Sequence, residues 1–151
     1  MTTTLPKSIL VATDFGPTSE QALDYAMHLA RAVGARVTVV HTYDIPSVGL
    51  AQGALVGTSE MIASVVADAQ AALDGALARR KDSGVAMNAL LESGDPREVI
   101  HAVAEKIGAD LVVMGTHGRR GLSRWLIGSV AESVVRTSTR PVLTVRGPNG
   151  T

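Results

Sequence analysis

Apolar residues along the chain fall into two patterns: short continuous runs, and longer stretches in which they recur every three or four positions. Continuous runs favour strands that are buried on both faces, as in parallel sheets. Recurring positions favour helices with one buried face. Strands are therefore predicted at residues 8–13, 37–42, 85–92, 111–114 and 141–146, and helices at about 17–33, 58–83, 96–107 and 129–138.

Residues at the predicted helix ends support these assignments. Asp95-Pro96-Arg97-Glu98 supplies an N-cap carboxylate, a proline at the first position and a glutamate at the third. Pro17-Thr18-Ser19-Glu20 offers start signals and Gly34 a stop, while Thr58 or Ser59 can cap the second helix.

The alternation of strands and helices predicts an α/β fold, because parallel strands need crossover helices on both faces of the sheet. We expect an open five-stranded parallel sheet of the Rossmann-like, nucleotide-binding type with strand order 3-2-1-4-5. In that order the first and fourth strands are neighbours. The length of 151 residues, without internal repeats or linkers, fits one domain over residues 1–151.

Residues 43–57 break the alternation. They contain Pro46 and three glycines, Gly49, Gly53 and Gly57, which predicts an irregular connection. Long connections in compact domains often act as lids over a site. A plain mobile connector explains the same residues equally well.

Charge and composition narrow the possible partners. The 14 Lys and Arg residues balance the 14 Asp and Glu residues, and aromatic residues make up 3%. Nucleic-acid or anionic-lipid binding is therefore not expected, since both need positive charge and single strands need stacking platforms. Cysteine is absent, which excludes disulfides and thiolate zinc sites. With no signal-peptide pattern and no segment near the ~20 apolar residues of a membrane helix, we predict a cytoplasmic protein without a membrane partner.

The most informative motif is Gly115-Thr116-His117-Gly118, followed after nine residues by Gly128-Ser129. A glycine loop between a strand and a helix suits phosphate, because the backbone can approach the anion and the helix offers N–H groups and a positive dipole end. The motif matches neither common phosphate fingerprint. A tight strand-to-helix connection alone would explain it as well.

Ligands of open parallel sheets bind beyond the carboxyl ends of the strands, near the point where the strand order reverses. The first predicted strand ends at Thr13-Asp14 and the second at His41-Thr42. In the expected order, Asp14 faces the glycine loop across a crevice. Asp14 could also simply cap the following turn, and His41 is expected to be a packed, hydrogen-bonded histidine rather than a metal ligand.

Three motifs together resemble the universal stress protein family: Ala12-Thr13-Asp14-Phe15, Gly94-Asp95-Pro96, and the glycine spacing that closes with Pro141-Val142. The resemblance covers about residues 7–146. The intact glycine spacing is similar to that of the ATP-binding subset of the family. It implies ATP as the ligand, with or without Mg²⁺, which commonly binds through substrate phosphates.

The resemblance also implies roles for particular residues. The adenine and ribose end would be contacted from the first two strands, ribose and phosphates by the glycine loop, and phosphates by the start of the last helix. The site residues so implied are Ala12, Thr13, Asp14, Thr42, Met114, Gly115, His117, Gly118, Arg119, Gly128, Ser129 and Val130. His117 could instead be a loop residue in solvent, and Arg119, Arg120 and Arg124 could form a solvated basic rim.

Hydrolysis needs a positioned base beside the reacting phosphate. Asp14 is assigned to the ribose end, and His117 has no evident orienting carboxylate. We therefore predict an ATP-binding regulator of the stress response with slow or no hydrolysis. Alternatives are a nucleotide-independent homodimeric interaction module that binds another protein, a weak ATPase, or a cyclic AMP binder. The last strand, residues 141–146, is expected at a sheet edge, where antiparallel pairing of two copies gives a homodimer.

Overall fold

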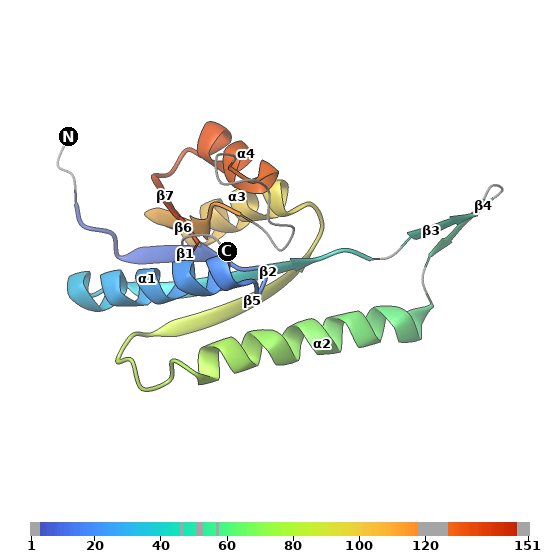
Figure 1. Ribbon diagram of the computed structural model, residues 1–151, viewed down its shortest axis with the longest axis horizontal. Helices are drawn as coiled ribbons and strands as arrows, with labels where there is room; N and C mark the ends of the chain where they lie inside the picture. The colour runs from blue at the N-terminus through green and yellow to red at the C-terminus, as the bar shows by residue number, and fades with distance from the viewer. Residues whose placement is uncertain (1–3, 46, 51–52, 57, 118–126, 148–151) are drawn as a thin grey trace.

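The computed structural model describes residues 4–45, 47–50, 53–56, 58–117 and 127–147 (Figure 1). Its centre is a five-stranded sheet in the order β5-β2-β1-β6-β7, with every neighbouring pair parallel. The strands are β1 (Ser8–Ala12), β2 (Arg36–Tyr43), β5 (Met87–Ser93), β6 (Leu111–Gly115) and β7 (Val142–Val145). Counted among these five, the order is the predicted 3-2-1-4-5, so the predicted fold class is confirmed.

Two helices cover each face of the sheet, as the buried clusters show. Helices α1 (Pro17–Val33) and α2 (Ser59–Ala78) share one core with Ile9 and Val11. Helices α3 (Pro96–Ile107) and α4 (Ser129–Thr137) share the other core with Leu10. Successive residues of a strand point to opposite faces, so the continuous apolar run of β1 fills both cores.

The predicted N-cap of α3 is confirmed. The Asp95 carboxylate accepts a hydrogen bond of 2.9 Å from the Arg97 N–H, and Pro96 is the first helical residue. The side-chain bond from Arg97 lowers the pKa of Asp95 to about 2, so the cap is ionised at neutral pH. Gly108 ends the helix in the left-handed region, with φ of 62°.

Helix α2 begins after Thr58, whose hydroxyl accepts from the Met61 N–H at 3.3 Å. It ends at Ala78 rather than near Ser83, because the chain then enters tight turns in which Ser83 N–H donates to the Arg80 carbonyl. The helical period alone does not distinguish a last helical turn from such turns.

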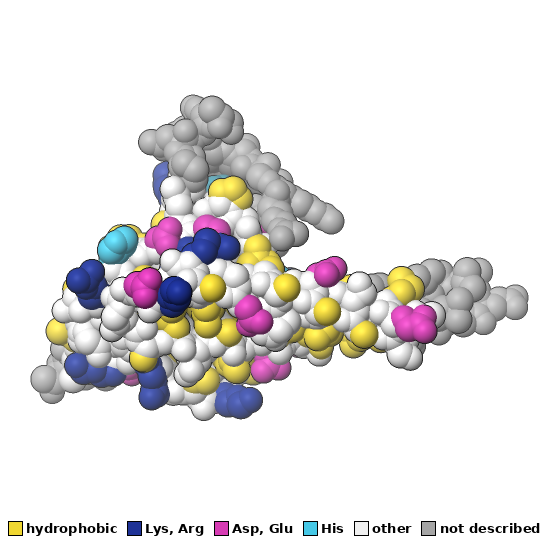
Figure 2. Space-filling model, turned by 90° about the horizontal axis from the view of Figure 1, so that it is seen from below, with side chains coloured by type: hydrophobic (Ala, Val, Ile, Leu, Met, Phe, Trp, Pro, Cys, Tyr) yellow, Lys and Arg dark blue, Asp and Glu magenta, His cyan; other side chains and the backbone are white. Residues whose placement is uncertain are grey.

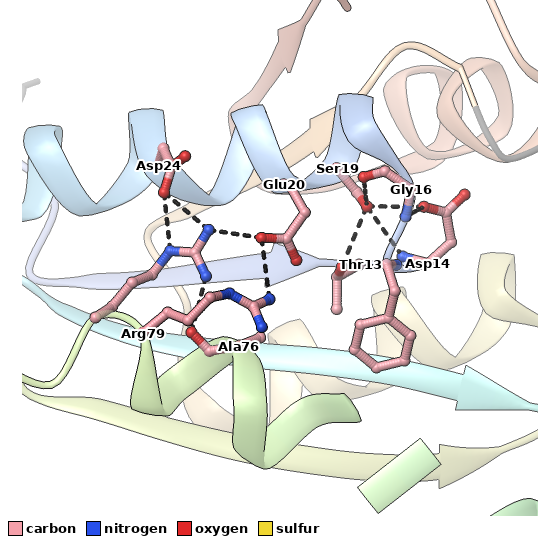
Figure 3. A network of polar contacts seen from close by, with 10 residues as sticks. Thr13, Asp14, Gly16, Ser19, Glu20, Asp24, Ala76 and Arg79 are labelled. Atoms are coloured by element: carbon pink, nitrogen blue, oxygen red, sulfur yellow. Dashed lines mark hydrogen bonds and ion pairs between the residues drawn. The ribbon is translucent and has the colours of Figure 1, made fainter. Parts of the chain in front are cut away.

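Arg80 fastens the end of α2 to α1 through ion pairs. Its acceptors Glu20 and Asp24 on α1 and Ala76 on α2 are labelled in Figure 3. Its guanidinium lies 2.7 Å from the Glu20 carboxylate and 2.8 Å from that of Asp24, and it donates to the Ala76 carbonyl at 2.8 Å. The Arg80 side chain is only 10% exposed. A nearly buried guanidinium with three acceptors is a stabilising contact between the helices.

The prediction of an irregular connection over residues 43–57 was wrong. Strand β2 continues to Tyr43, and β3 (Ser47–Leu50) and β4 (Gly53–Val56) form an antiparallel hairpin. Valine and leucine in both halves favour strands, and the glycines that suggested irregular structure are compatible with a hairpin. In Figure 1 the hairpin projects from the body beside the start of α2.

Helix α2 differs from the expectation that no segment of the chain is long and apolar enough to cross a membrane. It is 20 residues long with a hydropathy of 1.3, so length and composition alone would allow it to cross a membrane. One such helix is weak evidence for a membrane span, because core helices and signal sequences pass the same test. Leu73 and Ala76 of α2 lie in the core with α1, but only 11% of the apolar window is buried. Its other end is more open, with Met61 48% exposed. Figure 2 shows hydrophobic and acidic side chains along the part of the molecule that holds the start of α2. Lys and Arg side chains gather toward the other end of the molecule.

Candidate functional site

A cavity of about 620 Å³ lies at the carboxyl ends of β1, β2 and β6, beside the starts of α3 and α4. All predicted site residues that the structure describes line it: Ala12, Thr13, Asp14, Thr42, Met114, Gly115, His117, Gly128, Ser129 and Val130. Gly118 and Arg119 lie outside the described residues, as do Arg120 and Arg124. The structure therefore brings together residues that are more than 100 positions apart in the sequence.

Sequence reasoning missed further lining residues. Several of them form apolar walls: Val40 is 1% exposed, Ile100 2% and Ala131 2%, with Pro96 beside them. The others are Ser19, His41, Asp44 and Thr116. Ile100 and Ala131 lie on the buried faces of α3 and α4, and the helical period did not single them out. Only the tertiary arrangement shows that this core opens into a cavity.

The turn between β1 and α1 places Asp14 at the cavity. Figure 3 shows Asp14 beside Gly16 and Ser19 in this turn. One carboxylate oxygen of Asp14, Oδ1, accepts from the Gly16 N–H at 2.8 Å and from the Ser19 hydroxyl at 2.7 Å. Asp14 therefore does cap the turn, as the simpler interpretation predicted. It lines the cavity at the same time, so the capping role and a ligand role are compatible.

The start of α4 gives the cavity an anion-binding character. Gly128 precedes the helix and supplies no side-chain cap, while its own N–H donates to the Thr116 carbonyl at 2.6 Å. The first N–H groups of a helix have no partner within the helix and carry the positive end of its dipole. Ser129 and Val130 lie in this first turn and line the cavity. A phosphate there would meet backbone donors.

Gly115 has a packing role, in addition to the approach of the backbone to an anion that the sequence suggested. A Cβ on Gly115 would lie 2.8 Å from Cγ2 of Thr18 and 3.1 Å from the Thr18 carbonyl carbon. The glycine thus allows the start of α1 to pack against the end of β6.

His117 is half-buried rather than a solvent-facing loop residue. Its Nδ1 lies 2.9 Å from the Thr116 hydroxyl. Its Nε2 is buried and has no hydrogen-bond partner among the described residues. Buried polar atoms are usually bonded, so this nitrogen on the cavity wall suits a ligand contact. Within the described residues, the hydrogen bonds of His117 include no carboxylate that would orient it as a base.

The described lining of the cavity carries acidic side chains but no Lys or Arg. The acidic residues are Asp14 and Asp44. Across the described part of the chain, His, Asp and Glu nowhere gather in a group of three that could hold a metal ion. The helix start is therefore the described feature that favours an anion. As predicted, His41 is hydrogen-bonded, with Nδ1 2.8 Å from the Thr13 carbonyl oxygen.

Comparisons with known proteins agree with the sequence motifs. A family model described as the universal stress protein family matches residues 6–146. Universal stress protein MJ0531 of Methanocaldococcus jannaschii is 37% identical over 146 residues, which cover 95% of this chain and 84% of that protein.

Solved structures share the fold. Hypothetical protein MJ0577, also from Methanocaldococcus jannaschii, superposes with a TM-score of 0.82 at 27% identity, covering 97% of this chain and 100% of that one. A universal stress protein in complex with cAMP gives 0.72 at 26% identity, over 95% and 98% of the two chains. That of Archaeoglobus fulgidus in complex with dAMP gives 0.68 at 26% identity, over 94% and 99%.

Proposed function

The chain belongs to the universal stress protein family, and from this premise we propose that its cavity binds an adenine nucleotide, with ATP as the physiological ligand. One observation carries the proposal. An apolar-walled cavity lies at the carboxyl ends of neighbouring parallel strands and receives the start of α4. The similar structures in complex with cAMP and dAMP support an adenine ligand.

The base fits the apolar part of the cavity. Adenine is flat and weakly polar, so it gains from burial between Val40, Ile100 and Met114, which are at most 5% exposed. Ala12 and the backbone at Thr42 complete this end of the cavity. A base that enters here leaves its sugar near the ends of β1 and β6.

The sugar and phosphates then meet the polar part. Asp14 is the acceptor for ribose hydroxyls, with Thr13 beside it. The N–H groups around Gly128, Ser129 and Val130 bind the phosphates, and the buried Nε2 of His117 contacts the same ligand. Met114 and Gly115 pass beneath the ribose. The predicted contacts of Gly118 and Arg119 remain part of the proposal.

Mg²⁺ can accompany ATP without a protein-built metal site. The described cavity offers two carboxylates, Asp14 and Asp44, but no group of three metal ligands. Mg²⁺ keeps several waters and commonly binds through substrate phosphates and few protein groups. When bound, it would neutralise phosphate charge, while the helix start orients the phosphates.

The described groups of the cavity support binding rather than turnover. A hydrolase needs a base oriented beside the attacked phosphorus. The described hydrogen bonds of His117 lead to Thr116 and not to a carboxylate. We therefore propose a regulator that holds ATP as a signal and hydrolyses it slowly or not at all. Turnover above buffer background that His117→Ala abolishes would favour a weak ATPase.

The test is the identity of the nucleotide retained through purification, read by chromatography after denaturation. ATP added at 100 times its Kd should stabilise the protein by about 2.7 kcal/mol through mass action. For a chain of this size that corresponds to a rise in Tm of roughly 5–10 °C. Competition between ATP and cyclic AMP distinguishes the two ligands. No retained nucleotide together with no thermal shift would favour a nucleotide-independent interaction module.

The assembly is part of the proposal. Strand β7 is an edge of the sheet and pairs with β6 on one side. Antiparallel pairing of two β7 edges would give a homodimer with two-fold symmetry. The single domain over residues 1–151, the cytoplasmic location and the absence of nucleic-acid or membrane partners remain predictions.

A further inference from the structure

We propose that His41 is a positioning residue, which acts through Thr13 to hold the Asp14 carboxylate in place for the ribose hydroxyls of the bound nucleotide. The inference rests on the proposed function and deepens it. The observation is a side-chain tether between two neighbouring strands, at the point where the first of them leaves the sheet. His41 is thereby given a role in ribose recognition that sequence reasoning did not assign to it.

The hydrogen bond between His41 and Thr13 extends the pairing of β1 with β2 by one bond. The β1–β2 register runs to Ala12 opposite Val40, and the Thr13 N–H then donates to the Val40 carbonyl at 3.0 Å. Beyond that point the Thr13 carbonyl lies 2.8 Å from Nδ1 of His41. A carbonyl oxygen can only accept, so Nδ1 carries the hydrogen. A side chain of β2 thus takes the place of the next backbone donor.

The residue after Asp14 shows that this turn is held under strain. Phe15 has φ of +62°, and it is the one described residue other than glycine with positive φ. A bulky residue takes this conformation only where its surroundings determine it. The Phe15 ring lies 4.3 Å from the His41 ring, centroid to centroid. His41 therefore contacts the turn twice, through its Nδ1 and through its ring face.

The backbone donors of the turn are all bonded to side chains. The N–H groups of Asp14 and Phe15 donate to Ser19 Oγ at 3.3 Å and to Thr13 Oγ1 at 3.1 Å. The Gly16 N–H donates to Asp14 Oδ1 at 2.8 Å. The direction of the Asp14 carboxylate is thus a property of the turn as a whole.

Among the groups that fix the turn, Thr13 and Ser19 belong to it or to the helix that follows it. His41 comes from the neighbouring strand and joins the turn to the sheet. Without the Nδ1 donor, the Thr13 carbonyl loses its partner and the strained turn can relax. Relaxation would move the Asp14 carboxylate away from the ribose. The start of α4 and the apolar side chains of Val40, Ile100 and Met114 that are proposed to bury the base would be unchanged, because none of them takes part in the hydrogen bond between His41 and Thr13.

The experiment compares ATP with 2′,3′-dideoxy-ATP, which lacks the ribose hydroxyls, by calorimetry. His41→Phe keeps a ring against Phe15 and removes the donor, whereas His41→Asn keeps an amide donor near the position of Nδ1. We expect wild type to prefer ATP over the dideoxy analogue by about tenfold, which is roughly 1.4 kcal/mol. His41→Phe should abolish the preference and His41→Asn should restore most of it.

A matched control is His28→Phe, because His28 is exposed on α1 and does not line the cavity. It should keep the wild-type ratio of the two affinities. That ratio is insensitive to a general loss of stability, which weakens both ligands alike. Equal weakening of both ligands in His41→Phe, or no preference in wild type, would overturn the positioning role and leave nucleotide binding standing. Wild type that binds neither ligand would overturn the proposed function itself.

Discussion

The contact between α1 and the ends of β6 and β7 gives a prediction that can be worked from distances. Cβ atoms placed on Gly115 and Gly147 would lie 2.8 Å and 2.6 Å from side-chain atoms of Thr18. On Gly115, the new atom would also meet the Thr18 backbone, with the carbonyl carbon at 3.1 Å and the oxygen at 3.2 Å. On Gly147, the next nearest atom is Cβ of Thr18 at 3.5 Å, an ordinary contact.

The two substitutions should therefore differ. Overpacking against backbone typically costs 1–3 kcal/mol, whereas a glycine-to-alanine change without strain gains about 0.4–1 kcal/mol through the unfolded state. Neither Gly115 nor Gly147 has positive φ, so the gain applies to both. We expect Gly115→Ala to lower the unfolding free energy by about 1–2 kcal/mol. Gly147→Ala should cost less, since the Thr18 hydroxyl can rotate away.

Thr18→Ala provides the control through a double-mutant cycle, with urea unfolding followed by circular dichroism. Removing the Thr18 methyl and hydroxyl should fully rescue Gly147→Ala. It should rescue Gly115→Ala only in part, because the Thr18 backbone stays in place. If Gly115→Ala is as stable as wild type, or if Thr18→Ala rescues it completely, the close approach of the α1 backbone to β6 is not what the glycine serves.

Three further predictions concern stability and assembly. Arg80→Met should lower the unfolding free energy measured in urea by about 1–3 kcal/mol, because Glu20 loses its nearly buried partner. An unchanged midpoint of urea unfolding would contradict a stabilising contact of Arg80 between α2 and α1. The pKa of Asp95 falls from its ordinary 3.8 to about 2 beside Arg97, so its stabilising effect is present above pH 3.8 and lost as the pH falls through 2. Asp95→Asn should flatten the pH dependence of the urea midpoint over that range, and an equally steep dependence would refute the assignment. Thr144→Pro removes a backbone N–H from the edge strand β7, so light scattering should show a monomer in place of the proposed dimer. A dimer that survives would place the interface elsewhere.

Much of the fold could be predicted because its signals are local. The apolar run of β1 shows a strand buried on both faces, and Asp95 with Pro96 marks the start of α3 within one residue. The alternation of strands and helices indicates a parallel sheet, but it does not by itself determine the order of the strands, which was expected to be 3-2-1-4-5. The hairpin of β3 and β4 was missed because its glycines are read as breaks when no partner strand is evident.

The residues of the candidate site also differ in whether the sequence alone could identify them. The glycine motif and Asp14 could be identified from the sequence, since their residue types and positions after strands are informative. Pro96 and Ile100 could not, because a helix start approaches the strand ends only through tertiary packing. Nor could the partnership of Phe15 with His41, which depends on a backbone conformation that a phenylalanine seldom adopts.

The start of α4 is proposed to bind the phosphates of a nucleotide. Ser129→Asp puts a negative charge at the first position of α4, inside the cavity. Ser59→Asp puts the same charge at the first position of α2, outside the cavity, and serves as its matched control. Both helices should tolerate the acid, which suits a helix N-terminus.

Calorimetric titration of ATP into wild type and these two variants shows whether α4 holds the phosphates. We expect Ser129→Asp to weaken ATP binding by at least about tenfold through repulsion of the phosphates, while the affinity for adenosine stays within about twofold. Ser59→Asp should bind ATP as wild type does. If Ser129→Asp and Ser59→Asp bind ATP equally well, or if wild type does not bind ATP, the phosphates are not held at α4.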